Sequence, residues 1–265
     1  MPYENLTYET ADQLAKQFSL GKYKSVLHIT ATNSLRRGII QNNSELRWLE
    51  APILTFGQIL EQVGYQWFSG KVQLKQYTAI SSFLRKHSEE NKPSLNPSIF
   101  NALDKNKDIM LRTIRTFEEA GVTNCDVKNA LKSPYYEEKL CLDLWDRLEK
   151  TSSFQSFRRW FRDFDEKADS IFMEMVENIL IDTYKNENII ERNLSNLTPK
   201  TFASTDELKQ IARNYTNDLL KDKAIVFHGF YFITPIQQRI IRSLEKAGYT
   251  IIQLINYREG YPSVF

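Results

Sequence analysis

The segment from Lys223 to Tyr257 constrains the fold most, because its apolar pattern changes period twice over a short stretch. Residues 224–227 form an apolar run with β-branched residues at its centre, as a buried parallel strand requires. Apolar residues then recur at every fourth position of a polar stretch, at Ile236, Ile240 and Leu244. This spacing predicts an amphipathic helix, and a second apolar run at 250–255 predicts a returning strand. The segment therefore predicts a β-α-β unit and a parallel sheet.

The first part of the chain repeats this alternation of strand and helix. We expect a short helix over residues 7–20, a strand over 25–30 and a second strand over 51–56 that runs into a helix. Residues 71–220 are almost continuously helical in pattern, including one long helix predicted over 99–120.

These patterns predict the fold class α/β. A parallel sheet domain formed by residues 1–70 and 223–265 is interrupted by a large helical insertion domain at residues 71–222.

Composition limits the classes of function. The net charge of +2 is nearly neutral, so a nucleic-acid surface has to be a local patch. No apolar run approaches the roughly 20 residues that span a bilayer, and no membrane partner is expected. Two cysteines without a signal peptide suggest reduced thiols and a cytoplasmic location. Three isolated histidines lack metal-ligand spacing, so we expect no metal and no cofactor in this segment.

The sequence contains no phosphate-binding loop. Such a loop needs GxxxxGK followed by Ser or Thr after a buried strand, because its amides cradle phosphates and its hydroxyl binds magnesium. The nearest approach, Gly64 to Val72, is one residue too long, ends in Val72 and follows a predicted helix. ATP hydrolysis by this segment is therefore not expected.

Residues 227–237, FHGFYFITPIQ, carry a family resemblance. They resemble a segment of UvrD-like helicases, of the form VDEFQDTSPLQ, in which the acidic pair holds magnesium. Here His228 and Gly229 stand at those two positions. The segment is more similar to the ATPase-inactive, helicase-like region of AddB and RecC-type subunits, which has Asp-Gly-Phe there, so His228 alone departs from that pattern. The resemblance implies a RecA-like sheet domain with a degenerate magnesium site.

A second block strengthens the resemblance. In UvrD-like helicases, a Thr-Asn turn before a helix and a strand ending in Thr-Phe both touch single-stranded DNA. The matching residues here are Thr32, Asn33, Arg36 and Arg37 after the first strand, and Thr55 and Phe56 after the second. Hydroxyls and arginines suit phosphate, and an aromatic ring suits stacking on a base. Two alternatives stay open, in which Thr32-Asn33 is only a helix cap and Phe56 belongs to the core.

A basic aromatic cluster at residues 154–162 allows two interpretations. Its arginines and aromatics can track a DNA strand, with Trp160 stacked on a base. Alternatively the aromatics pack inward at helical spacing and leave the arginines on a solvated face, which is the interpretation we favour.

The predicted function is therefore a non-catalytic, helicase-like region that binds or guides DNA in a nuclease or recombination-repair protein. Single-stranded or duplex-end DNA is the expected partner, together with a helicase-nuclease partner subunit. The resemblance implies that this segment is the N-terminal part of a longer protein carrying a PD-(D/E)XK exonuclease. The alternative is a protein scaffold that docks a helicase or nuclease partner without binding DNA. An enzyme using His228 as acid or base is a weaker third possibility, since no catalytic partner is near it in sequence.

Overall fold

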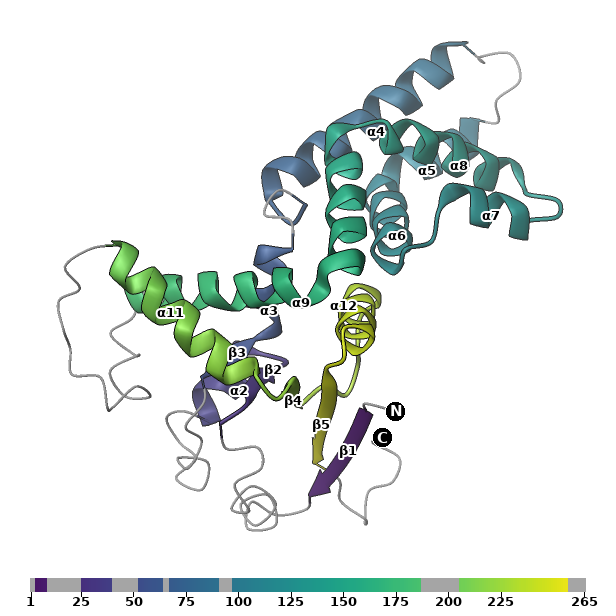
Figure 1. Ribbon diagram of the computed structural model, residues 1–265. Helices are drawn as coiled ribbons and strands as arrows, with labels where there is room; N and C mark the ends of the chain where they lie inside the picture. Colours follow the sequence, from purple (N-terminus) through teal and green to yellow (C-terminus); the bar gives the residue numbers. More distant parts are fainter. Residues whose placement is uncertain are drawn as a thin grey trace. The chain divides into compact units, whose positions relative to one another are not determined.

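The computed structural model describes residues 3–8, 25–39, 52–63, 67–90, 97–186 and 205–256. The chain divides into two units, which are described separately here (Figure 1). The sheet unit comprises Met1–Gln62, Phe164–Ile233 and Ile240–Phe265. The helical unit comprises Val63–Asp163 and Thr234–Arg239.

Within the described residues, the sheet unit is built on five strands that pair in parallel, in the order β1-β5-β4-β2-β3. Figure 1 shows β1 alongside β5. Their bounds are Tyr3–Tyr8 for β1, Leu27–Thr30 for β2, Ile53–Thr55 for β3, Ala224–His228 for β4 and Thr250–Asn256 for β5. The predicted α/β class with a parallel sheet is thus confirmed.

Strand β1 was not predicted. The expected helix over residues 7–20 is wrong at Thr7 and Tyr8, which pair with Ile255 and Asn256 of β5. The remainder of that expected helix lies outside the described residues. A helical period in a short stretch does not exclude a strand, because pairing with a distant strand overrides local preference.

The sheet is buried by helices on the same unit. These are α2 (Asn33–Arg37), α3 (Phe56–Gln62), α11 (Thr205–Leu220), and the later parts of α9 (Ser152–Asn186) and α12 (Pro235–Lys246). Apolar side chains of the central strands are almost fully buried, including Leu27, Ile29, Ile225, Val226, Ile251 and Ile252. The predicted helix face of α12 is buried as well. Such burial on both sides explains why these strands appear as continuous apolar runs.

Helix α9 changes the expected division of the chain. From Phe164 onward it belongs to the sheet unit, where Phe172 packs edge-on against Tyr249 and the Tyr249 hydroxyl donates to Asp169 over 2.7 Å. Figure 1 shows α11 crossing this part of α9, and Ile181, Leu208 and Ala212 are buried together there. The first segment of the helical unit therefore ends at Asp163, whereas the sequence placed the boundary of the helical domain at residue 222.

The helical unit contains α4 (Gly70–Glu90), α5 (Pro97–Lys105), α6 (Lys107–Ala120), α7 (Asn124–Ala130), α8 (Tyr136–Glu149) and the first part of α9. The single helix expected over 99–120 is instead α5 and α6. Asn106 separates them, because its backbone leaves the helical region and its side chain bonds the Ala102 carbonyl. Helix α6 ends at Ala120 and is followed by Gly121, whose φ of 80° is left-handed, a conformation that glycine commonly supplies after a helix.

The basic aromatic cluster belongs to the core of the helical unit, as favoured. Phe154, Phe157 and Phe161 are buried, and Trp67 stacks on Phe157 with ring centroids 4.2 Å apart. Arg158 is bound by the carboxylate of Glu118, while Arg159 and Arg162 are exposed. The interleaved pattern therefore reflects one buried and one solvated face of α9.

Candidate functional site

Three adjacent strands of the sheet end in one row. Thr30 of β2 lies opposite Thr55 of β3 on one side and opposite His228 of β4 on the other. Because the strands are parallel, the turns that follow them emerge at the same edge, where open α/β sheets bind ligands. The two sequence blocks that carry the family resemblance therefore meet at this carboxyl edge.

A pair of buried histidines joins β2 to β4 below this edge. Nδ1 of His28 lies 2.7 Å from Nε2 of His228, and the two residues are 200 positions apart in sequence. Loss of solvation, reinforced by repulsion from His28, holds the pKa of His228 well below its usual value of 6.5. His228 is therefore neutral at physiological pH. The end of β4 therefore carries an uncharged, hydrogen-bonded ring, at the position where the expected resemblance to UvrD-like helicases would place a carboxylate.

Gly229 brings the chain after β4 against helix α2. Its φ of 71° lies in the left-handed region, and a Cβ atom here would stand 2.6 Å from Cδ2 of Leu35. The backbone amide of Ala31 also donates to the His228 carbonyl over 3.0 Å. The turn after β2 and the turn after β4 are thus in direct contact, and glycine is the residue that permits the close approach.

Thr32 and Asn33 lie at the start of α2 with exposed side chains. Thr32 is the N-cap, and its hydroxyl accepts from the Leu35 amide over 3.1 Å. The cap alternative is therefore confirmed for Thr32. Although the Thr32 hydroxyl caps the helix, both this hydroxyl and the side-chain amide of Asn33 remain exposed at the surface.

Arg36 and Arg37 have different environments. Arg36 is buried, and its Nε donates to the Ile53 carbonyl of β3 over 2.7 Å. Arg37 is exposed. Adjacent helical residues point in different directions, so a doublet of arginines supplies one side chain to the fold and the other to solvent. Arg37 alone of the two is placed for a phosphate contact.

Thr55 and Phe56 belong to the interior of the edge. Thr55 caps α3, because its hydroxyl accepts a hydrogen bond from the backbone amide of Gln58 over 3.2 Å. The Phe56 ring is 1% exposed and packs near Phe227 and Phe230, with centroids 6.0 and 5.8 Å away. The core alternative for Phe56 is confirmed, and a stacking role expected for this ring lacks an exposed face.

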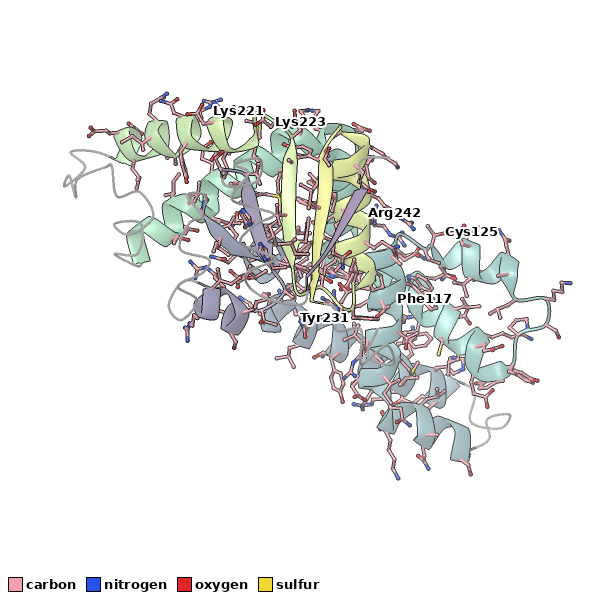
Figure 2. All side chains as sticks on the ribbon, turned by 90° about the horizontal axis from the view of Figure 1, so that it is seen from below. Phe117, Cys125, Lys221, Lys223, Tyr231 and Arg242 are labelled. Carbon is pink, nitrogen blue, oxygen red and sulfur yellow. The ribbon has the colours of Figure 1, made fainter. Side chains whose placement is uncertain are left out.

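The loop after β4 exposes two aromatics that the sequence reasoning did not single out. Tyr231 is 63% exposed and Phe232 is 78% exposed, whereas the preceding residue, Phe230, is buried. Figure 2 shows Tyr231 at the end of the β4 strand opposite to Lys223. The available signal was the run Phe230-Tyr231-Phe232 directly after a strand. Because all three residues of this run are aromatic, its hydrophobicity favours burial of the whole run. Periodicity does not predict which of the three rings is buried.

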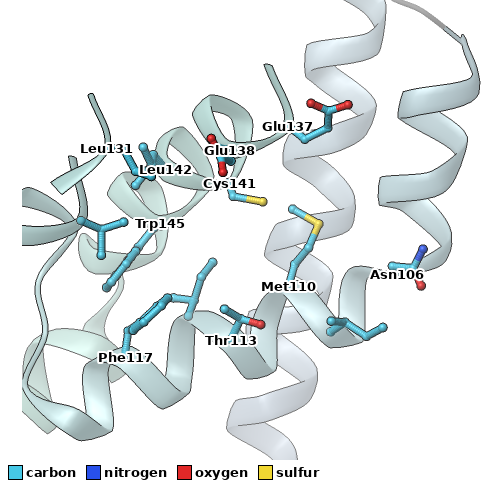
Figure 3. A pocket seen from close by; sticks show the side chains of 13 residues that line it. Asn106, Met110, Thr113, Phe117, Leu131, Glu137, Glu138, Cys141, Leu142 and Trp145 are labelled. Atoms are coloured by element: carbon cyan, nitrogen blue, oxygen red, sulfur yellow. The ribbon is translucent and has the colours of Figure 1, made fainter. Parts of the chain in front are cut away.

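The helical unit has a separate apolar pocket of about 460 Å³ between α6, α7 and α8 (Figure 3). Phe117 and Trp145 stack at one end of it, with ring centroids 5.6 Å apart. Glu137, Glu138 and Cys141 lie at another part of its wall. Burial, with smaller contributions from Glu138 and Glu137, raises the pKa of the Cys141 thiol, so this sulfur is a poor nucleophile.

Two features are absent from the parts of the chain that the structure describes. No three His, Cys, Asp or Glu side chains there come together in a way that would hold a metal ion. Nor does any helix there have the length and hydrophobicity needed to cross a membrane.

No protein-family model matches this chain, and no curated protein matches it significantly.

Proposed function

We propose that this chain is a helicase-like, ATPase-inactive region that binds and guides DNA as part of a nuclease or recombination-repair protein. In this proposal the sheet unit is a RecA-like domain, and the helical unit is the large insertion expected between its early and late strands. The partner is single-stranded or duplex-end DNA, handled together with a helicase-nuclease subunit.

The observation that carries the proposal is the meeting of the two resembling blocks at one sheet edge. The turn at Thr32 and the turn at Gly229 come from opposite ends of the chain, yet β2 and β4 are neighbours and end in the same row. This is the arrangement that a strand-binding edge of a helicase-like domain requires. The neutral His228 in place of a carboxylate agrees with a region that does not hydrolyse ATP, since it offers no charge for magnesium.

Binding would rely on the exposed polar groups of this edge. The Thr32 hydroxyl and the Asn33 amide can hydrogen-bond phosphate or sugar oxygens, and Arg37 supplies a cation. Such contacts position a strand without reading its sequence, which suits a guide that passes DNA to a nuclease centre elsewhere.

The experiment is fluorescence anisotropy of a labelled single-stranded oligonucleotide with the 265-residue chain at several salt concentrations. We expect binding that weakens as salt rises and does not respond to ATP. Arg37→Ala should reduce the slope of log K against log salt by about one, the loss of one phosphate contact. Arg159→Ala is the matched control, because it removes an exposed arginine from the helical unit. An unchanged slope for Arg37→Ala would remove this residue from the interface.

A second candidate function is a protein scaffold that docks a helicase or nuclease partner without touching DNA. The apolar pocket of the helical unit favours it, because Ile109 and Phe117 on its wall are exposed. Absence of oligonucleotide binding at low salt would leave the scaffold as the better explanation.

A further inference from the structure

Tyr231 and Phe232 are adjacent large aromatic residues with exposed side chains, on the loop that follows β4. Single exposed apolar side chains are ordinary on protein surfaces. Neighbouring exposed rings at the carboxyl edge of an α/β sheet are instead typical of a surface that binds a ligand. We infer that Tyr231 and Phe232 form a stacking platform for unpaired nucleobases. This inference rests on the proposed DNA-binding function and names the part of the ligand that the sheet edge recognises.

The backbone on which the two rings stand is held in place. On its N-terminal side, Phe230 is buried against Phe227, with ring centroids 5.2 Å apart. The Phe230 carbonyl accepts from Nε2 of the buried Gln253 on β5, over 2.6 Å. Gly229 is pressed against Leu35. A loop fixed in this way presents its rings at little entropic cost, which favours a preorganised binding surface.

The surroundings of the platform suit a nucleic acid strand. Through the contact of Gly229 with Leu35, the loop lies beside α2, whose first residues expose the Thr32 hydroxyl and the Asn33 amide. These polar groups match a sugar-phosphate backbone, and the two rings match the faces of bases. Every base has such a face, so the platform would select unpaired bases and not a sequence. Paired bases are stacked inside a duplex and cannot reach it.

The test compares three fluorescein-labelled probes of equal length with the full chain. They are an oligothymidylate, an oligomer of abasic deoxyribose phosphates, and a blunt duplex. The two single strands carry equal charge, and the duplex carries about twice as much. We expect the oligothymidylate to bind at least about tenfold more tightly than the abasic strand and the duplex. Tyr231→Ala with Phe232→Ala should remove the difference between the oligothymidylate and the abasic strand while leaving the salt dependence unchanged, because no charge is lost.

Two further variants separate stacking from other effects. Tyr231→Leu with Phe232→Leu keeps apolar surface but has no aromatic face, and it should behave like the alanine pair. Tyr135→Ala removes another aromatic, 76% exposed, from the helical unit and should bind like the wild type. Because Tyr231 and Phe232 are exposed, the alanine pair should keep the wild-type unfolding midpoint, which circular dichroism would check.

The outcomes separate this inference from the proposed function. Salt-dependent binding with equal affinity for the oligothymidylate and the abasic strand would overturn the stacking platform and leave the proposed function standing. Full recovery of affinity in the leucine pair would likewise overturn it. A wild-type protein that self-associates through these residues, seen as a dimer that the alanine pair abolishes, would assign the rings to a protein contact instead. Absence of binding to every probe would remove both proposals.

Discussion

At the scale of single residues, the chemistry of the carboxyl edge depends on burial. His228, at the end of β4, is hydrogen-bonded to His28 inside the sheet. Arg36 is used to satisfy a β3 carbonyl, and Phe56 fills the core. The exposed side chains of this edge are Thr32, Asn33 and Arg37 on α2 and its cap, and Tyr231 and Phe232 on the loop after β4.

The histidine pair predicts a pH dependence of stability. The pKa of His228 is depressed only in the folded protein, so below the ordinary value of 6.5 the unfolded chain takes up a proton that the folded chain refuses. The contribution of His228 to the free energy of unfolding should therefore be constant above about pH 6.5 and fall below it, by about 1.4 kcal/mol per pH unit. Urea unfolding between about pH 5 and 8 measures this. His228→Asn should show a shallower decline over that range, and an identical decline would mean that other groups cause it.

At the scale of secondary-structure elements, a buried carboxylate joins three helices of the helical unit. Glu118 of α6 is 3% exposed and accepts from Trp145 of α8 and from Nε of Arg158 of α9, the latter over 2.8 Å. The bonds to Glu118, followed by those to Glu149, raise the pKa of Arg158. Its charge is therefore retained at any physiological pH, and α6, α8 and α9 are held in register.

Breaking this junction should destabilise the helical unit. Arg158→Met leaves the Glu118 carboxylate buried without its cation, and we expect a loss of roughly 3 kcal/mol in the free energy of unfolding. Arg159→Met, one position along the same helix, removes an exposed arginine and should change stability by less than about 0.5 kcal/mol. Chemical denaturation followed by tryptophan fluorescence would measure both. Equal small effects would show that the ion pair contributes nothing to stability.

At the scale of the whole molecule, the sheet unit is assembled from distant parts of the chain. Strand β1 at the N-terminal end pairs with β5, with Tyr3 opposite Ile251 and Asn5 opposite Gln253. Among the described residues, β5 is the only strand that pairs with β1, so β1 lies at the edge of the described sheet. The backbone of an edge strand in a parallel pair donates to its neighbour at alternate residues only.

This pairing can be tested by proline at neighbouring positions. Proline removes the amide hydrogen, so it is tolerated on an edge strand where that hydrogen faces away from the sheet. Of Asn5→Pro and Leu6→Pro, one should therefore lower the free energy of unfolding by about 1–3 kcal/mol more than the other, through the lost ladder bond. Each variant is the control for its neighbour. Equal costs, measured by urea unfolding, would contradict a paired β1.

The sequence by itself determined the α/β class, four of the five described strands and most of the described helices. Strands buried on both faces of a parallel sheet are continuous apolar runs, and amphipathic helices have apolar residues at every third or fourth position. The inward packing of the aromatic cluster on α9 was predictable for the same reason.

Only the tertiary structure decided three other features: the strand β1, the place of the later part of α9 and the burial of Arg36. Each of these features depends on a contact with a residue that is distant in sequence. β1 exists through β5, the later part of α9 joins the sheet through Tyr249, and Arg36 is buried by its bond to Ile53. Which ring of Phe230-Tyr231-Phe232 is inside was decided by the contacts of Phe230 with Phe56, Phe227 and Gln253. Local pattern records that a side chain is apolar, whereas its neighbours in space determine whether it is core or surface.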